Sequence, residues 1–235
     1  MIHSNLNVAA RIDHTILKPE AMLHQVQQII NEAKQHQFAA VCVAPVWVPL
    51  VARGLADTNV MVCTVSGFPH GTSKPVIKAI ESTSAVKDGA HEVDVVAHLP
   101  HLLAHDLDAA RAELTEVVRA VRAARREAVV KVIVESAALL AAGADAGERS
   151  IEVACRAVRE SGCDFIKTST GFHPAGGASV EAVRLMKRHG QGLLIKASGG
   201  IRDLPTALAM IDAGADRLGL SASVAIVEAL AKPQP

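Results

Sequence analysis

Eight short runs rich in apolar and β-branched residues alternate along the chain with longer stretches of helical periodicity. The predicted strands are Arg11–Asp13, Ala40–Val43, Val60–Val65, Glu92–Val96, Val129–Glu135, Asp164–Thr168, Leu193–Ala197 and Asp216–Leu220. Strands that alternate with helices pair in parallel, because each parallel connection needs a crossover segment. Eight such units within 235 residues predict an α/β protein with a closed (β/α)8, or TIM, barrel. An open doubly wound sheet is the alternative that this alternation leaves.

The clearest of the intervening helices is predicted from Leu107 to Val121. Its apolar residues fall on one helical face and are Leu107, Ala110, Leu114, Val117, Val118 and Val121. Asp106 or Asp108 is placed to cap its start, and its arginine-rich end suits the negative end of the helix dipole. We expect residues 1–235 to form a single catalytic barrel, with 1–9 as an N-terminal extension and 232–235 as a flexible tail.

Charge and composition restrict the partners of the chain. Basic and acidic residues balance at 24 each, so no overall field attracts nucleic acid or an anionic membrane. The longest apolar stretch, Ala39 to Ala52, is too short to cross a bilayer, and Met1 to Ala10 lacks the features of a signal peptide. The four cysteines show no C-x-x-C spacing and are expected to be free thiols. We therefore expect a cytoplasmic protein that acts on small molecules.

Ionisable residues occur inside four consecutive predicted strands. They are Asp94, Lys131 with Glu135, Lys167 and Lys196. A charged group within an apolar strand is costly unless it is paired or used, and active sites of such barrels form where the strands end. A salt-bridge network that only stabilises the barrel is the alternative explanation. Against it, Lys167 and Lys196 lie on adjacent predicted strands, where repulsion and desolvation lower a lysine pKa.

A lowered lysine pKa is what imine chemistry requires. An ordinary lysine has a pKa of about 10.4, whereas a nucleophilic amine works best with a pKa of ~7–8. That shift corresponds to roughly 4 kcal/mol, which burial and one neighbouring cation can supply. We predict that Lys167 attacks a carbonyl group, and that Asp94 and Lys196 share the proton transfers of the carbinolamine and enamine.

Glycine-rich segments are found where barrels of this type often bind phosphate. Ser198-Gly199-Gly200 follows the seventh predicted strand, and Gly219-Leu220-Ser221-Ala222 follows the eighth, just before a helix. Backbone N–H groups of such loops and a helix N-terminus bind phosphate. Gly171 and Gly176-Gly177, after the sixth strand, would widen the same pocket. Ordinary turns also need glycine, so a purely structural explanation stays open.

Several motifs, in order from about residue 11 to 228, resemble those of the deoxyribose-phosphate aldolase family. They are Ile12-Asp13-His14-Thr15-x-Leu17-Lys18, Val41-Cys42-Val43-x-Pro45, Gly67-Phe68-Pro69-x-Gly71, Glu92-Val93-Asp94-x-Val96, Lys131-Val132-Ile133-x-Glu135, Phe165-Ile166-Lys167-Thr168-Ser169-Thr170-Gly171-Phe172 and Lys196-Ala197-Ser198-Gly199-Gly200-Ile201-Arg202. The resemblance implies reversible cleavage of 2-deoxy-D-ribose 5-phosphate into acetaldehyde and D-glyceraldehyde 3-phosphate, without a metal or organic cofactor. It also implies a homodimer or higher homo-oligomer.

The resemblance assigns a role to individual residues. By matched position, Lys167 forms the Schiff base, Lys196 tunes its pKa and Asp94 assists proton transfer. The expected substrate- and phosphate-binding residues are Gly171, Gly199, Gly200, Gly219 and Ser221. The expected supporting residues are Asp13, Thr15, Lys131 and Glu135.

Some positions depart from the usual family pattern. They are Ala44, His98, Pro100, Leu220 and Ala222, the last two of which remove hydroxyl groups from the expected phosphate loop. A related Schiff-base aldolase with a different aldehyde or phosphate preference is therefore an alternative. The spacing of His98, His101 and His105 raises a metal-dependent lyase as another, although Pro100 argues against a regular helix there. A barrel that binds a sugar phosphate without catalysis is the third.

Overall fold

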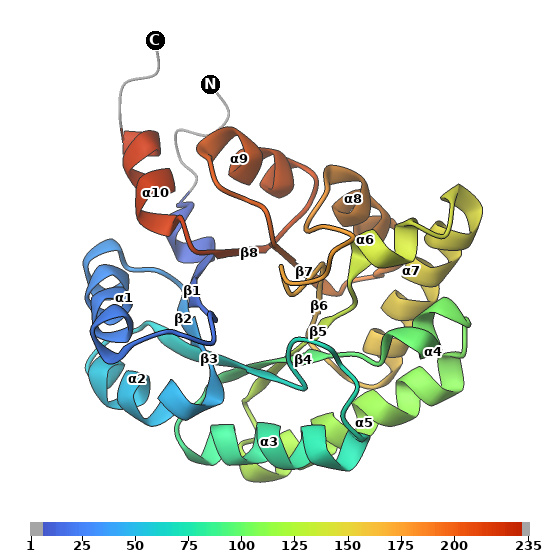
Figure 1. Cartoon of the computed structure of the whole chain (residues 1–235), viewed down its shortest axis with the longest axis horizontal. Helices are drawn as coiled ribbons and strands as arrows, with labels where there is room; N and C mark the ends of the chain where they lie inside the picture. Colours follow the sequence, from blue (N-terminus) through green and yellow to red (C-terminus); the bar gives the residue numbers. More distant parts are fainter. Residues whose placement is uncertain (1–6, 232–235) are drawn as a thin grey trace.

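The chain folds into one closed barrel of parallel strands surrounded by helices. The computed structural model describes residues 7–231; the predicted tail at 232–235 and residues 1–6 of the predicted extension lie outside the described residues. Each strand pairs with its neighbours in sequence, and the eighth strand pairs with the first. Figure 1 looks down the barrel and shows the strands at the centre with the helices in a ring around them. The predicted (β/α)8 architecture is confirmed.

The strands are β1 (Ile12–Ile16), β2 (Ala40–Val43), β3 (Met61–Ser66), β4 (Glu92–Val96), β5 (Val129–Ile133), β6 (Phe165–Lys167), β7 (Leu194–Ser198) and β8 (Arg217–Leu220). The α-helices are α1 (Leu23–His36), α2 (Val48–Leu55), α3 (Pro75–Lys87), α4 (Leu99–Leu103), α5 (Leu107–Ala124), α6 (Ser136–Leu140), α7 (Ala144–Glu160), α8 (Val180–His189), α9 (Leu204–Asp212) and α10 (Ser223–Ala231). Two short 3-10 helices, η1 (Ala9–Arg11) and η2 (Pro45–Trp47), precede β1 and α2.

The predicted bounds of the second and fourth strands are confirmed. Those of the third, sixth, seventh and eighth strands differ by one residue at one or both ends, and those of the first and fifth differ by more. Strand β1 runs on to Ile16, beyond the predicted end at Asp13. Strand β5 ends at Ile133, two residues before the predicted end, because Glu135 adopts a left-handed backbone with φ of 50°. Gly219, which was expected both at the end of the eighth strand and in the segment after it, lies within β8, where it pairs with Asp13 of β1 and Ser198 of β7.

The predicted apolar face of α5 is confirmed. Five of its residues, Ala110, Leu114, Val117, Val118 and Val121, are buried. The helix begins after Asp106, whose carboxylate accepts a hydrogen bond from the backbone N–H of Ala109 at 3.0 Å. Burying each large apolar side chain contributes about 1.5–3 kcal/mol, so this face fastens α5 to the outside of the barrel.

The interior of the barrel is divided by polarity. Small apolar side chains from β2 and β3 form one cluster, made of Ala40, Cys42, Cys63 and Val65. Charged side chains from β1, β4, β5, β6, β7 and β8 fill the rest, and they are Asp13, Glu92, Asp94, Lys131, Lys167, Lys196 and Arg217. A lipid bilayer could not be spanned by any helix among the described residues, since none is both long and apolar enough.

Candidate active site

A single carboxylate, that of Asp94 on β4, joins three lysines inside the barrel. Oδ2 of Asp94 accepts hydrogen bonds from Nζ of Lys167 at 2.7 Å and from Nζ of Lys196 at 2.6 Å. Oδ1 accepts one from Nζ of Lys131 at 3.0 Å. Lys167 and Lys196 both donate to this one oxygen atom. Their nitrogens therefore lie in the same part of the barrel interior, at a separation no greater than the sum of those two distances. Four of the five ionisable residues singled out in consecutive strands therefore meet at one point, and Glu135 is the exception.

Three further residues complete this interior charge network. Nζ of Lys196 lies 2.5 Å from Oδ2 of Asp13, and Nζ of Lys131 lies 2.5 Å from Oε2 of Glu92. The guanidinium of Arg217 contacts Asp13 and, at 3.2 Å, Glu92. Sequence reasoning missed Glu92 and Arg217 as site residues, although period-two alternation carried the signal. Glu92 precedes Asp94 by two residues, and Arg217 precedes Gly219 by two, so each pair lies on one strand face.

The opposite charges outweigh burial in this network. Burial opposes ionisation of Asp94, yet Lys131, Lys167 and Lys196 hold its pKa well below the ordinary value. Burial likewise opposes a charged Lys196, but Asp13 and Asp94 raise its pKa above the ordinary value. At neutral pH, Asp94 is therefore a carboxylate and Lys196 an ammonium ion.

Lys131 behaves like Lys196. It is fully buried, which disfavours its charge, but Asp94 and Glu92 are among the groups that raise its pKa well above the ordinary value. Nζ of Lys131 also lies 3.6 Å from Asp13 and 5.8 Å from the ring centre of Phe165. Lys131 is thus a buried, paired cation of the charge network, and it is not a candidate nucleophile.

Lys167 differs from the other two lysines in its surroundings. Among the residues that the structure describes, its ammonium pairs with one carboxylate, Asp94, whereas Lys196 pairs with two and Lys131 with three. It is also the one of the three that lines a cavity of about 690 Å³. The same cavity is lined by Thr15, Lys18, Gly171, Gly199, Gly200, Arg202, Gly219 and Ser221. The structure therefore brings Lys167 and all the predicted substrate-binding residues to one opening.

Two of these glycines are required by close packing. A side chain at Gly219 would place its Cβ 2.7 Å from Cβ of Ser198 and 3.1 Å from Cε of Lys196. A side chain at Gly199, which has φ of 90°, would place its Cβ 2.4 Å from Oγ of Ser169. Gly200 also has a positive φ, of 81°, but meets no described atom within 4 Å. Phosphate binding by these residues remains a prediction, because packing already accounts for two of them.

The supporting residue Thr15 forms a hydrogen bond within β1, whereas the supporting residue Glu135 holds a loop in place. Oγ1 of Thr15 donates a hydrogen bond to the backbone carbonyl of Asp13 at 2.8 Å. Oε1 of Glu135 accepts one from the backbone N–H of Thr170 at 2.8 Å, which ties the end of β5 to the loop after β6. The prediction that Glu135 lies in the fifth strand with Lys131 was wrong, since Glu135 lies beyond β5 in a left-handed conformation.

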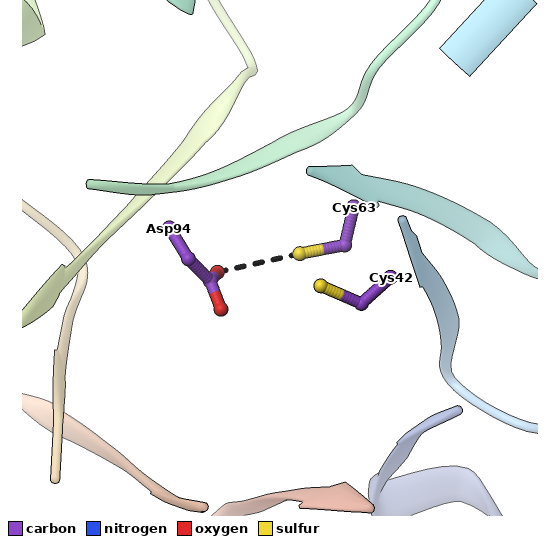
Figure 2. A group of neighbouring side chains, drawn as sticks. All are labelled: Cys42, Cys63 and Asp94. Carbon is purple, nitrogen blue, oxygen red and sulfur yellow. Dashed lines mark hydrogen bonds between the residues drawn. The ribbon is translucent and has the colours of Figure 1, made fainter. Parts of the chain in front are cut away.

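Two cysteines approach Asp94 from the apolar side of the barrel. Figure 2 shows Cys42 and Cys63 pointing toward Asp94, with the hydrogen bond from Sγ of Cys63 to Oδ1 at 3.3 Å. Sulfur and carboxylate donors within 4.8 Å of one another have the spacing of metal ligands. Both oxygens of Asp94 already accept from ammonium groups, however, so a metal ion would have to displace them. All four cysteines are free thiols, as predicted.

The three histidines with metal-like spacing do not converge. A helix does form here, α4, because Pro100 stands in its first turn, where proline is tolerated. The rings of His98 and His101 pack with their centroids 4.7 Å apart. His105 lies beyond the helix end with φ of 57°, and its Nε2 is 3.0 Å from Oγ of Ser150. The metal-dependent alternative therefore loses the ligand set on which it depended.

Comparison with known proteins agrees with this geometry. The model of the DeoC/LacD family aldolases matches residues 7–228. The deoxyribose-phosphate aldolase of Enterococcus faecalis is 48% identical over 217 residues, which are 92% of this chain and 94% of the relative. That of Mycobacterium avium is 48% identical over 231 residues, covering 98% and 100%.

Solved structures give the same picture. The protein described as "QR15, an Aldolase" has a TM-score of 0.85 at 39% identity, with 96% of each chain covered. The deoxyribose phosphate aldolase of Aeropyrum pernix, described as having a unique tetrameric structure, has a TM-score of 0.85 at 30% identity, with 96% of this chain and 91% of that chain covered. The family model matches residues 7–228, which are nearly the whole chain, and Lys167 lines the barrel cavity. This chain therefore belongs to the DeoC/LacD family of aldolases.

Proposed function

We propose that the chain is a class I aldolase that reversibly cleaves 2-deoxy-D-ribose 5-phosphate into acetaldehyde and D-glyceraldehyde 3-phosphate. Curated relatives that are nearly half identical over almost the whole chain carry the name of this activity. The single observation that carries the mechanism is the position of Lys167. It lines the cavity and shares one carboxylate oxygen with a second lysine.

The charge count of the interior network supports Lys167 as the nucleophile. Among the described residues, four cationic side chains (Lys131, Lys167, Lys196 and Arg217) meet three carboxylates (Asp13, Glu92 and Asp94). Loss of one proton relieves this excess, and it breaks fewest ion pairs when it comes from Lys167. Lys196 then stays charged beside the neutral amine, as nucleophilic catalysis by lysine requires.

The proposed reaction begins with attack of Nζ of Lys167 on the C1 aldehyde of the substrate. The carbinolamine loses water to form an imine, and removal of the C3 hydroxyl proton then breaks the C2–C3 bond. Glyceraldehyde 3-phosphate leaves, and the electron pair stays on the enzyme as an enamine. Protonation at C2 and addition of water release acetaldehyde and regenerate the amine. Asp94 and Lys196, each within hydrogen-bonding distance of the other, carry these protons.

The phosphate end of the substrate is proposed to bind across the loops after β7 and β8. Gly199, Gly200, Gly219 and Ser221 line the cavity there, and α10 begins two residues after Ser221. Backbone N–H groups at a helix N-terminus favour an anion. Lys18, Arg202 and Gly171 line the same cavity, and the two cations give it the local positive charge that the neutral chain as a whole lacks.

We further propose that the enzyme is cytoplasmic, uses no metal or organic cofactor, and assembles as a homodimer or higher homo-oligomer. The apolar side chains of Val76, Ile77 and Ile80 on α3 are 46%, 50% and 61% exposed, which supports a contact between copies. Sedimentation analysis of the purified protein tests the assembly.

The test of the mechanism is reductive trapping. Sodium borohydride added with acetaldehyde is expected to leave one ethyl group on the peptide that contains Lys167. The same treatment of Lys18→Met, which removes another lysine of the cavity wall, is expected to give the same adduct. An adduct on a different lysine, or none, would contradict the proposed mechanism.

A further inference from the structure

His14 is a buried ionisable residue at the edge of the active-site cavity that the reaction steps do not use. It lies on β1, is 2% exposed and lines the cavity together with Glu32 of α1. Its Nδ1 is 2.9 Å from Oγ of Ser223, and its Nε2 is 2.7 Å from Oε2 of Glu32. The imidazole therefore bridges α1 to the first residue of α10.

This bridge ends on the loop proposed to hold the phosphate. Oγ of Ser223 also donates a hydrogen bond to the backbone carbonyl of Leu220 at 3.1 Å. In strand register, His14 stands beside Leu220. The imidazole and Ser223 thus hold both ends of the segment 220–223, which connects β8 to α10 and contains Ser221.

The bridge forms with two protonation states of the imidazole. A neutral ring with its proton on Nε2 donates to Glu32 and accepts the hydroxyl proton of Ser223, which is then not donated to the Leu220 carbonyl. A doubly protonated ring donates to both partners, and the Ser223 hydroxyl then donates to the Leu220 carbonyl. Glu32 is itself oriented by Nε2 of Gln28, which donates to its Oε1 at 2.7 Å. The ring is also in contact with Phe38, with centroids 5.1 Å apart.

The residues of the segment 220–223 give a reason for the bridge between His14 and Ser223. Leu220 and Ala222, which flank Ser221 on the cavity wall, are apolar and offer no hydroxyl group to a phosphate. With fewer side chains to bind phosphate, recognition depends more on backbone N–H groups, and these act only when the segment is held in one position.

We propose that His14 is a positioning residue for phosphate recognition, which fixes residues 220–223 through Ser223 and is itself anchored by Glu32. The proposal rests on the proposed phosphate site. It predicts a defect confined to the phosphate end of the substrate, because His14 has no contact with Lys167, Lys196 or Asp94 among the interactions of residues 7–231.

The test compares phosphorylated and phosphate-free substrate in the full-length enzyme. His14→Leu is expected to raise KM for 2-deoxyribose 5-phosphate about tenfold, since a buried hydrogen-bond partner is lost, with kcat within about twofold of wild type. The kcat/KM for 2-deoxyribose is expected to stay unchanged. His14→Asn, whose amide reaches Ser223, is expected to recover part of the loss. His24→Asn, on the exposed face of α1, is the matched control and is expected to match wild type.

A second variant keeps the test decisive if His14→Leu does not fold. Ser223→Ala removes the far end of the bridge and is expected to raise KM for the phosphorylated substrate in the same selective way. Equal losses on both substrates, or an unchanged KM in Ser223→Ala, would overturn the proposal. A wild-type enzyme that fails to cleave 2-deoxyribose 5-phosphate would instead refute the proposed function, so the two failures are distinguishable.

Discussion

Two regions of the molecule bury lysine, and they do so in opposite ways. Lys78 on α3 is fully buried outside the barrel, where its ammonium donates to the carbonyls of Gly71 and Val96, both at 2.7 Å, and pairs with Glu113 of α5. Each of its three protons has its own acceptor. Inside the barrel, by contrast, Lys167 and Lys196 share one oxygen of Asp94.

The difference shows that burial does not identify a reactive lysine. Lys78 is held in a saturated arrangement that closes the β3–α3 loop over the end of β4, and it lines no cavity described for residues 7–231. Lys167 has fewer acceptors and an open side. We propose that shared acceptors and access to a cavity distinguish a lysine that reacts from one that stabilises.

The largest difference between the two regions is expected when Lys167 is replaced. Lys167→Met is expected to lower kcat/KM by about four orders of magnitude or more, because the nucleophile is removed. Its stability is expected to stay within about 1 kcal/mol of wild type, since the variant removes the excess cation of the network. Steady-state kinetics and urea denaturation measure the two quantities. Retained activity, or a large loss of stability, would contradict the distinction.

Lys78→Met is expected to show the opposite pattern. The free energy of unfolding should fall by about 3–5 kcal/mol, because Glu113 is left buried without its partner. Activity per folded molecule should remain. The double variant Lys78→Met with Glu113→Leu should recover part of the loss, and the comparison would fail if the double variant were no more stable than the single one.

Lys196→Leu sharpens the comparison within the barrel. Turnover is expected to fall about hundredfold or more, since a proton carrier is lost. The ascending limb of the pH–rate profile should also move to higher pH, because the cation that shares an oxygen of Asp94 with Lys167 is removed. An unmoved profile would show that Lys196 acts on proton transfer alone.

Acid stability gives the smallest expected effect. The pKa of Asp13 in the folded protein is lowered by Lys196, Lys131 and Arg217 despite burial. Its contribution to stability is therefore fully present above the unfolded pKa of about 3.9 and is lost as pH falls further below it. From pH 5 to pH 3, Asp13→Asn should lose stability less steeply than wild type, by up to ~1.4 kcal/mol per pH unit. Identical slopes in urea titrations would argue against the shift.

The sequence was most informative where pattern and chemistry coincide. The alternation of strands and helices predicted the closed barrel, and the polar residues inside apolar strands predicted Asp94, Lys167 and Lys196 as one cluster. The end of β5 was mispredicted because the left-handed backbone of Glu135 leaves no mark in hydrophobic periodicity. Predictions from local sequence patterns succeed for features that repeat along one helix or strand.

Partners that are distant in sequence could not be predicted in the same way. Lys78 stands in a helix, where a lysine ordinarily reaches solvent, and its partner Glu113 lies on another helix. The bridge from His14 to Ser223 joins residues 209 positions apart. Closure of the barrel, which pairs β1 with β8, brings these last two residues together.

The absence of a side chain at Gly219 leaves room for the extended side chain of Lys196. With Cε of that lysine 3.1 Å from where a Cβ would stand, an alanine at this strand position would push the ammonium away from its carboxylates while leaving every charged residue in the sequence. Two chains with identical lysines and aspartates can thus differ in catalytic activity because of one uncharged neighbouring residue. An inventory of reactive groups is therefore incomplete without the small residues that make room for them.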